Sequence, residues 1–486
     1  MNRRDFLRRT GGSIAGVALA AARPAGRTMA GEPAKPGRAK RPPIAGPLAA
    51  HPDNRRYFTD GSGRAVYLTG SHTWPNLVDM GTSDPPPPFD FTAYLDFLDR
   101  YDHNFVRLWT WELTQWDTRA NGENARHTVR PLPFARTGPG AALDGKPKFD
   151  LARFEPEYFD RMRRRVMAAR DRGIYVSVML FEGWGMQFVA DAWKAHPFHP
   201  SNNTSGIGGG IAKGVDIYTL ADRPVTKVQE AYVRKVVDTV NDLDNVLYEI
   251  SNENHPPSTP WQYHVIRLIH DYERTKPKRH PVGMTFQYKG GSNRTLFDSP
   301  ADWVSPNPEG GYRDDPPAAD GRKVILSDTD HLWGLGGNRG WVWKSFLRGM
   351  NPLFMDPYDG GVLGKKLDPQ WEPVRKSLGA TLRLASRLRL AAMTPQGKLA
   401  SSGYCLAGNT GRGMEYLVYL PKGGEVSVDL SAGRGALSVR WITPEEGRVQ
   451  SSSIRSSIAP KIEGGGRRTL TAPFPGDAAL WLAPAG

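Results

Sequence analysis

Short apolar runs alternate with longer amphipathic stretches along most of the chain from Val66 onward. The stretches between the runs carry apolar residues at three- and four-residue spacing, which is the period of an α-helix. Eight strands with helices between them predict a (β/α)8 barrel, because open doubly wound sheets rarely contain so many parallel strands. The predicted strands are 66–70, 104–110, 174–180, 246–251, 281–286, 303–306, 323–327 and 351–355, and the predicted helices are 91–101, 156–172, 225–243, 261–275, 341–348 and 371–390.

The final part of the chain has a different pattern. Alternating apolar and polar residues mark strands at 415–420, 425–430, 437–442 and 468–472, with glycine-rich turns between them. This spacing is typical of a small antiparallel β-sandwich. We therefore predict an α/β protein with a TIM barrel over 51–391 and a β-sandwich over 392–486.

The N-terminal segment has the pattern of an export signal. Arg3 and Arg4 precede Phe6, Leu7 and an apolar run over 11–22 that ends among small residues. This pattern is typical of a twin-arginine signal peptide, predicted over 1–30, and a disordered spacer rich in Pro, Lys and Arg follows over 31–50. The apolar run is roughly half the ~20 residues that a membrane span needs. We predict an exported protein, periplasmic or extracellular, with no membrane span in its mature form.

The formal net charge of +14 does not indicate a nucleic-acid partner. Residues 1–48 hold ten Lys or Arg and only two acidic residues, so most of the excess belongs to the export segment. The remaining positive charge is dispersed and forms no basic stripe with interleaved aromatics. Cys405 is the single cysteine, which excludes an intrachain disulfide and a zinc cluster held by cysteines.

Polar residues follow nearly every predicted strand. In a TIM barrel, catalytic groups lie where the strands end and the loops begin. Carboxylates at so many consecutive strand ends favour an active site, since a fold gains nothing by crowding them there. In chain order, the candidate residues are His72, Trp74, Arg107, Trp111, Glu182, Trp184, Asn252, Glu253, His255, Tyr288, Glu309, Asp328, Asp330, His331 and Asp356.

Two of these strand ends can hold the carboxyl pair that glycosidic cleavage needs. One carboxyl must carry a proton for the leaving oxygen, and the other must be ionised to attack the anomeric carbon or to activate a water. Strands four and seven lie on opposite sides of the barrel mouth. Glu253 and one of Asp328 and Asp330 can therefore lie across a sugar ring. The alternative sources of the second carboxylate are Glu182, Glu309 and Asp356.

The remaining candidates suit substrate binding. His72 and Trp74 could form the floor of a sugar subsite. Trp111 and Trp184 could be stacking platforms, although core packing is the commoner role of a single tryptophan. Arg107 would hold the strand-seven carboxylate in its charged form. A purely structural role for Arg107, in a buried salt bridge inside the barrel, is equally plausible and compatible with the first.

The end of strand four carries the most specific motif. Asn252–Glu253 resembles the Asn and acid/base pair of the clan A glycoside hydrolases, which are retaining enzymes on (β/α)8 barrels. That resemblance implies that Asn252 hydrogen-bonds the sugar 2-hydroxyl and that Glu253 is the general acid/base. The segments 57–63, 68–74 and 325–332 are also similar to an uncharacterised bacterial family of twin-arginine-exported glycoside hydrolases, whose C-terminal domain is labelled collagen-binding.

The chain departs from the clan at the end of strand seven. The clan has a nucleophilic Glu there, whereas this chain offers only Asp328 and Asp330. Aspartate is one methylene shorter, so three possibilities stay open: a retaining mechanism with an Asp, an inverting mechanism, or a second carboxylate from another strand. Asp330 ranks slightly ahead of Asp328 because it lies further toward the mouth.

Two other functions compete with a hydrolase that cleaves a poly- or oligosaccharide without a cofactor. A metal-dependent hydrolase could use His72 and the 328–331 segment, but no His-x-His follows strand one and no Lys or His follows strand four at the place of a ligand. A non-catalytic carbohydrate- or matrix-binding protein would explain the absent strand-seven Glu. We predict the glycoside hydrolase, with no metal ligands and with a carbohydrate substrate as its partner.

Overall fold

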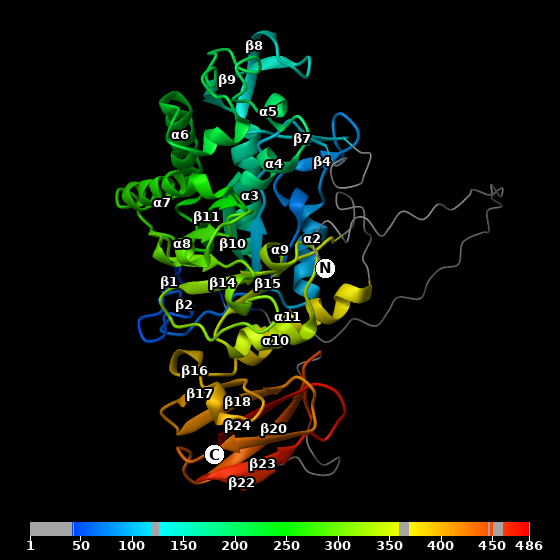
Figure 1. Ribbon diagram of the computed structural model, residues 1–486, viewed down its shortest axis with the longest axis vertical. Helices are drawn as coiled ribbons and strands as arrows, with labels where there is room; N and C mark the ends of the chain where they lie inside the picture. The colour runs from blue at the N-terminus through cyan, green and yellow to red at the C-terminus, as the bar shows by residue number, and fades with distance from the viewer. Residues whose placement is uncertain are drawn as a thin grey trace, which may run out of the picture.

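A computed structural model describes residues 41, 43–117, 126–358, 369–445, 448–450 and 460–485 (Figure 1). The predicted signal peptide over 1–30 and most of the predicted spacer lie outside these residues. At the end of the spacer, β1 (Ala49–Ala50) pairs with β2 (Phe58–Thr59). Leu48 is buried in a hydrophobic cluster that includes Phe58, so the predicted disorder does not extend to this part of the chain.

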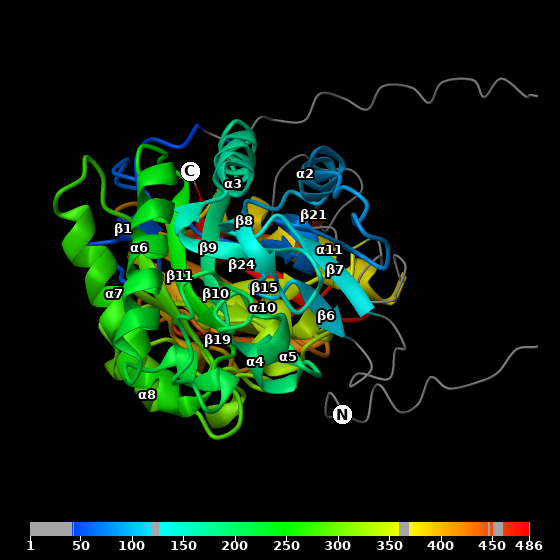
Figure 2. The ribbon, with the colours of Figure 1, turned by 90° about the horizontal axis from the view of Figure 1, so that it is seen from above.

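The centre of the molecule is a sheet of eight parallel strands, as predicted. Every strand is buried along its whole length, which is expected for strands covered on both faces. Figure 2 shows α3, α6, α7 and α8 around the outside of β10 and β11. In chain order the strands are β3 (Gly70–His72), β5 (Phe105–Leu108), β10 (Tyr175–Glu182), β11 (Val246–Asn252), β12 (Val282–Thr285), β13 (Trp303–Ser305), β14 (Val324–Asp328) and β15 (Asn351–Met355).

The barrel closes between its first and second strands, β3 and β5. The backbone N–H of Asn104 donates to the carbonyl of Thr69 at 3.0 Å. A Cβ at Gly70 would come within 2.2 Å of the Phe105 carbonyl oxygen, so only glycine permits this approach. The fold is a (β/α)8 barrel, which confirms the prediction.

The first strand begins four residues later than predicted, at Gly70 rather than Val66. The side-chain amide oxygens of Asn351 and Asn104 accept the backbone N–H groups of Leu68 and Thr69. These side chains take the place of strand partners, so the ladder starts only at Gly70.

Helices pack against the outer face of the sheet with their apolar sides inward. In α6 (Arg223–Val240), Asp222 caps the first turn by accepting the Val225 N–H, and valines at three- and four-residue spacing are buried. The other helices of this layer are α2 (Phe91–Arg100), α3 (Pro156–Arg170), α7 (Thr259–Glu273), α8 (Asn293–Asp298), α10 (Arg339–Leu347) and α11 (Glu372–Ala385), and a short α9 (Thr329–Leu332) directly follows β14.

Insertions after the early strands were not predicted. They gather at one end of the barrel, at the top of Figure 1. Their strands are short or interrupted by Gly and Pro, which weakens the alternation that marks a strand. They comprise a three-stranded sheet of β4 (Asp79–Gly81), β7 (Arg126–Arg130) and β6 (Gln115–Asp117), a hairpin of β8 (Phe134–Ala141) and β9 (Pro147–Phe154), and the short helices α4 (Gly183–Phe188), α5 (Ala192–Ala195) and η3 (Gly214–Tyr218).

The C-terminal part forms the predicted antiparallel sandwich, at the bottom of Figure 1. One sheet has the order β16 (Thr394–Pro395), β17 (Cys405–Asn409), β18 (Met414–Leu420), β24 (Ala478–Pro484), β20 (Ala436–Thr443) and β21 (Arg448–Gln450), with β22 (Lys461–Glu463) also paired to β20. The pair β19 (Glu425–Asp429) and β23 (Arg467–Thr471) covers it, and Val426 and Val428 lie in one core with Leu480 and Leu482.

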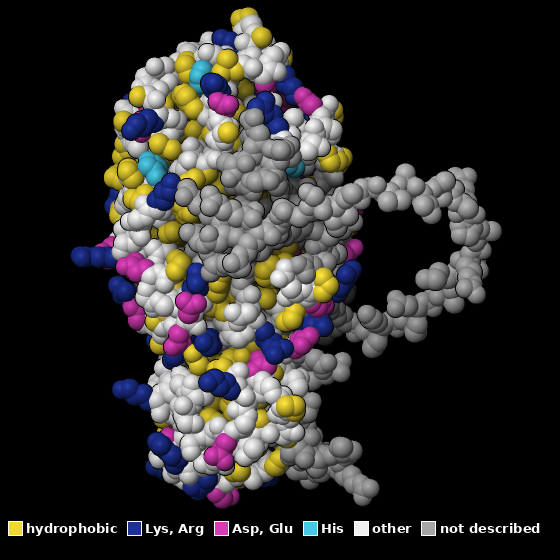
Figure 3. All heavy atoms as spheres, turned by 45° about the vertical axis from the view of Figure 1, so that its right-hand side comes forward, with side chains coloured by type: hydrophobic (Ala, Val, Ile, Leu, Met, Phe, Trp, Pro, Cys, Tyr) yellow, Lys and Arg dark blue, Asp and Glu magenta, His cyan; other side chains and the backbone are white. Residues whose placement is uncertain are grey.

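The sandwich packs against the barrel through a shared core. Trp343 of α10 stacks on Tyr419 of β18 with 5.8 Å between ring centroids, and Leu384 of α11 lies in the same cluster as Trp481. On the face shown in Figure 3, Lys and Arg side chains are interspersed with Asp and Glu rather than gathered in one patch. Within the described residues, no helix combines the length and hydropathy required to cross a membrane.

Candidate active site

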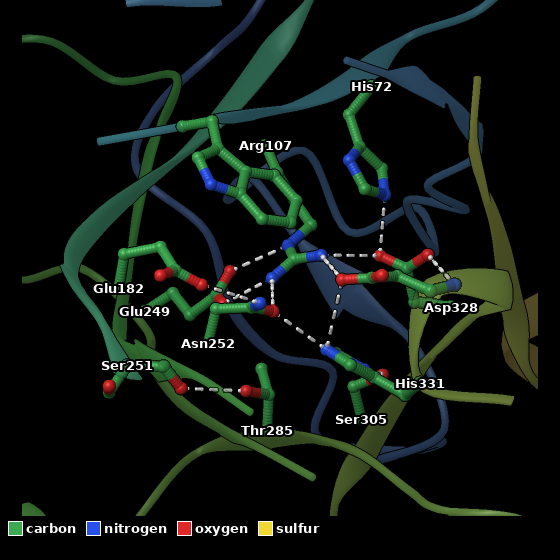
Figure 4. Close-up of polar contacts among 12 residues, drawn as sticks. His72, Arg107, Glu182, Glu249, Ser251, Asn252, Thr285, Ser305, Asp328 and His331 are labelled. Carbon is green, nitrogen blue, oxygen red and sulfur yellow. Dashed lines mark hydrogen bonds and ion pairs between the residues drawn. The ribbon is translucent and has the colours of Figure 1, made fainter. Parts of the chain in front are cut away.

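A single buried guanidinium organises the carboxyl ends of the barrel strands (Figure 4). Arg107 donates to both Glu249 carboxylate oxygens, at 2.9 and 2.6 Å, and to Asn252 Oδ1 at 2.7 Å. It also donates to Asp328 at 3.0 Å and to Asp330 at 3.4 Å. Burial lowers the pKa of Arg107, but the surrounding carboxylates raise it by more, so its pKa lies above the usual value. Arg107 therefore stays charged and joins strands two, four and seven.

Asp328 ends β14 and has both carboxylate oxygens engaged. Its Oδ1 accepts the Asp330 N–H at 2.9 Å and caps α9. Its Oδ2 lies 2.8 Å from His72 Nε2 and 3.0 Å from Arg107. Burial raises the pKa of Asp328, whereas the charges of His72 and Arg107 lower it by more, to well below the usual range. Asp328 is therefore ionised at neutral pH.

Asn252 is held in one orientation by residues from three strands. Its Oδ1 accepts from Arg107 and lies 3.2 Å from His331 Nε2. His331 Nδ1 lies 2.6 Å from the Ser305 hydroxyl. Burial, and then the Arg107 charge, lower the pKa of His331 to about 4, so the imidazole is neutral at pH 7. With Nε2 donating to Asn252, Nδ1 accepts from Ser305, and the Asn252 amide nitrogen is directed toward Glu182.

Glu182 ends β10 on the other side of this amide. Its Oε1 lies 3.3 Å from the Asn252 nitrogen, and its Oε2 accepts the Gly185 N–H at 2.5 Å. Burial raises the pKa of Glu182 to about 8, in spite of these two hydrogen bonds, and the charges of Glu112 and Glu253 act in the same direction. Glu182 therefore carries a proton at neutral pH.

Glu253 follows Asn252 on a strained backbone. It is 2% exposed and has a φ of +43°, in the left-handed region that non-glycine residues seldom adopt. Gln187 of α4 donates to the Glu253 carbonyl at 2.8 Å. A Cβ at Gly183 would lie 2.5 Å from the Asn254 side chain, so glycine is needed for this close packing. Such strain persists only where neighbouring structure fixes it, and it is concentrated at functional sites.

The predicted tryptophan platforms are packed against one another. The Trp74 ring centroid lies 5.7 Å from Trp111 and 4.5 Å from Trp116, and all three rings are buried. Trp184 packs 6.3 Å from Trp74 and is also buried. Trp111 and Trp184 are therefore packed in the core, which is the alternative that the sequence left open for them, and Trp74, predicted as the floor of a sugar subsite, is buried between them.

Three further candidates have local partners outside the Arg107 cluster. Asp356 is buried in an ion pair with Arg375 of α11. Glu309 is exposed and accepts the Asn293 N–H at the start of α8. His255 is half-buried, and its Nδ1 lies 2.8 Å from the Asn254 side-chain oxygen. Within the described residues, Asp356 and Glu309 thus bond helix residues rather than Arg107, and the source of the second carboxylate stays a prediction.

Sequence analysis missed Glu249 and Ser305. Glu249 lies inside β11 rather than at its end, and Ser305 ends β13. Glu112 accepts the Glu182 N–H at 2.8 Å and the Tyr218 hydroxyl at 2.7 Å, which braces the loops after strands two and three. One feature of the sequence could have identified Glu249, namely that it is a charged residue within an apolar strand. A buried charge requires a partner, so such a residue indicates a buried ion pair.

The fold and this cluster define a (β/α)8-barrel protein with buried carboxyl groups at its mouth. A family model described as "Domain of unknown function (DUF6298)" matches residues 118–289. No curated protein sequence matches the chain.

Solved structures share the barrel. A glycoside hydrolase family 5 protein from Bacteroides vulgatus aligns over 92% of this chain and 94% of its own, with 13% identity and a TM-score of 0.61. Another structure, described as a glycoside hydrolase, aligns over 91% of this chain and 97% of its own, with 13% identity and a TM-score of 0.58. At this level of identity the likeness shows a common fold.

Proposed function

We propose that this protein is a glycoside hydrolase that cleaves O-glycosidic bonds of a poly- or oligosaccharide, with Glu253 as its general acid/base. The observation that carries the proposal is the buried cluster at the strand ends. It joins Asn252, the residue before Glu253, to the strand-seven aspartates through Arg107. The shared barrel fold of structures described as glycoside hydrolases supports it.

Cleavage would begin with proton transfer from Glu253 to the glycosidic oxygen. The bond between that oxygen and the anomeric carbon breaks, and the sugar acquires oxocarbenium character. A carboxylate on the opposite side then either attacks the anomeric carbon or takes a proton from an attacking water. The buried surroundings strengthen these electrostatic interactions, because little water screens them.

Asp330 is the better choice for that carboxylate. Both oxygens of Asp328 are bound by protein groups, one in the cap of α9 and the other by Arg107 and His72. Asp328 would then be a positioning residue that stabilises Arg107. Asp330 contacts Arg107 through Oδ2, at the longer distance of 3.4 Å.

Asn252 would bind a sugar hydroxyl. Its oxygen is taken up by Arg107 and His331, so its nitrogen is the group that can donate to substrate. We further propose export through the twin-arginine route, which the Arg3–Arg4 segment supports.

The test is a screen of the purified protein against plant and bacterial polysaccharides, followed by Glu253→Gln. Release of reducing sugar by the wild type, and a loss of ~10²–10⁴-fold in the variant, are expected from the contribution of acid–base catalysis. Glu230→Gln is the matched control, since Glu230 lies on α6 and bonds His264 away from the cluster. A wild type that binds a polysaccharide and releases no sugar would instead be a binding protein.

A further inference from the structure

A group of partly exposed aromatic side chains lies beside Glu253. Phe188 ends α4, and Tyr288 follows β12; their ring centroids are 4.9 Å apart and their planes are nearly perpendicular, at 85°. Phe286 lies 5.9 Å from Tyr288. All three side chains are half-buried, whereas Trp184, whose ring centroid lies 5.3 Å from that of Phe188, and the tryptophans around Trp74 are buried. We call Phe188, Tyr288 and Phe286 the aromatic ledge.

The ledge is fixed to the segment that contains Glu253. Gln187, the residue before Phe188, donates to the Glu253 carbonyl at 2.8 Å. The Tyr288 N–H donates to the Asn254 carbonyl at 3.0 Å. At its inner end, Phe286 lies 6.3 Å from the ring of His331, which in turn contacts Asn252. The ledge therefore runs outward from the catalytic cluster on the Glu253 side.

A cation lies at the outer end of the ledge. The Lys289 ammonium is 4.8 Å from the centre of the Phe188 ring, and Lys289 is exposed. Its φ of +55° is unfavourable for a lysine, so the turn after Tyr288 is held by its surroundings. Partly exposed rings next to an ammonium donor suit a ligand with an apolar face and hydroxyl groups at its edge.

We infer that the aromatic ledge is the leaving-group subsite and takes a sugar ring of the substrate on the Glu253 side of the scissile bond. The inference rests on the proposed function, because a general acid must face the leaving oxygen and so fixes the side on which the leaving group lies. The apolar face of a pyranose packs on aromatic rings, and Tyr288 and Phe188 present such surface. The tryptophans around Trp74 do not, because their faces are buried in one another.

The experiment compares two substrates in wild type, Tyr288→Ala and Phe188→Ala. One is the oligosaccharide that the wild type hydrolyses in the screen, and the other is the glycosyl fluoride of the sugar it releases. Fluoride carries no ring and cannot contact the ledge. The ratio of kcat/KM for the oligosaccharide to kcat/KM for the fluoride is expected to fall about tenfold or more in either variant. Tyr288→Phe keeps the ring and should keep the ratio.

Tyr272→Ala is the matched control, since Tyr272 is a half-buried tyrosine on the outer part of α7. An unchanged ratio in both ledge variants, with an active wild type, would overturn the subsite and leave the proposed function standing. Equal losses on both substrates would also overturn it, because they indicate a structural role. A wild type that releases no sugar from any polysaccharide or oligosaccharide of the screen would overturn the proposed function and the subsite together.

Discussion

The two sides of the barrel mouth hold carboxyl groups in opposite protonation states. Asp328 on strand seven and Glu182 on strand three are both buried, with 0% and 3% of their surface exposed. Yet the pKa of Asp328 lies well below its usual range, whereas burial raises the pKa of Glu182 to about 8. Burial is common to both, so it cannot account for the difference.

The difference comes from the charged neighbours. Asp328 has the Arg107 guanidinium and His72 within 3.0 Å. Within the described residues, the Glu182 carboxyl accepts from neutral donors, the Gly185 N–H and the Asn252 amide, and the nearby Glu112 carboxylate raises its pKa further. Glycosidic cleavage needs one protonated and one ionised carboxyl group. Glu182 and Asp328 are not the proposed catalytic pair, but they show that this mouth can hold buried carboxyl groups in both states at one pH, beside Glu253 and Asp330.

Removing the Arg107 guanidinium should have the largest effect on the difference between the two sides of the mouth. In Arg107→Met, the carboxylates of Glu249, Asp328 and Asp330 lose their common partner inside the barrel. We expect the free energy of unfolding to fall by about 3–5 kcal/mol, as measured by urea denaturation. Arg107→Met combined with Glu249→Leu should recover part of that loss. A decrease below about 1 kcal/mol in the single variant would show that Arg107 is not the organising charge.

The two aspartates of strand seven should separate activity from stability. Asp330→Asn should lower kcat/KM by more than about 100-fold and change the free energy of unfolding little. Asp328→Asn should lower the free energy of unfolding, because it weakens the α9 cap and the contacts with Arg107 and His72. The two measurements are steady-state kinetics and urea denaturation. The reverse pattern would make Asp328 the catalytic carboxylate.

Glu182→Gln tests the protonated side through the pH dependence of stability. The pKa of Glu182 is raised from 4.5 to about 8 in the folded protein. Its stabilising contribution is therefore complete below pH 4.5 and is lost as the pH rises toward 8. The Gln variant lacks this loss, so its free energy of unfolding should rise relative to wild type by about 1 kcal/mol per pH unit in that window. A constant difference between the two proteins across urea titrations would show that Glu182 has an ordinary pKa.

Glu309→Gln should have the smallest effect. Glu309 is exposed, and it accepts the Asn293 N–H at the start of α8. The free energy of unfolding should change by less than about 1 kcal/mol. A larger change by thermal or urea denaturation would mean that the strand-six end is more closely coupled to the mouth than its contacts show.

Much of the fold could be predicted because the barrel strands are apolar runs of the right length. The first strand was misplaced because Asn104 and Asn351 satisfy backbone groups that a strand partner would otherwise bind. The strands inserted after strands one and two were missed because they are short, as in β4, or carry Gly and Pro, as in β8, and lack a clear period.

The site was also predicted only in part, because sequence position shows where a strand ends but not which partner a side chain contacts. Parallel strands end together, so Arg107, Asn252 and Asp328 could be placed at one mouth from sequence position alone. Glu249 could not, since it contacts Arg107 from inside a strand. Asp356 and Glu309 also follow strands, but each is bound by a helix partner that sequence position does not reveal.

At neutral pH, Glu182 and Asp328 have opposite protonation states. The most direct test of this difference is a carbon-13 NMR titration of the carboxyl groups, with Glu182→Gln and Asp328→Asn used to assign the two signals. The account predicts that Glu182 is protonated at neutral pH and titrates near 8, while Asp328 stays ionised throughout. Glu182 ionised at neutral pH, with both groups titrating at ordinary values, would contradict it.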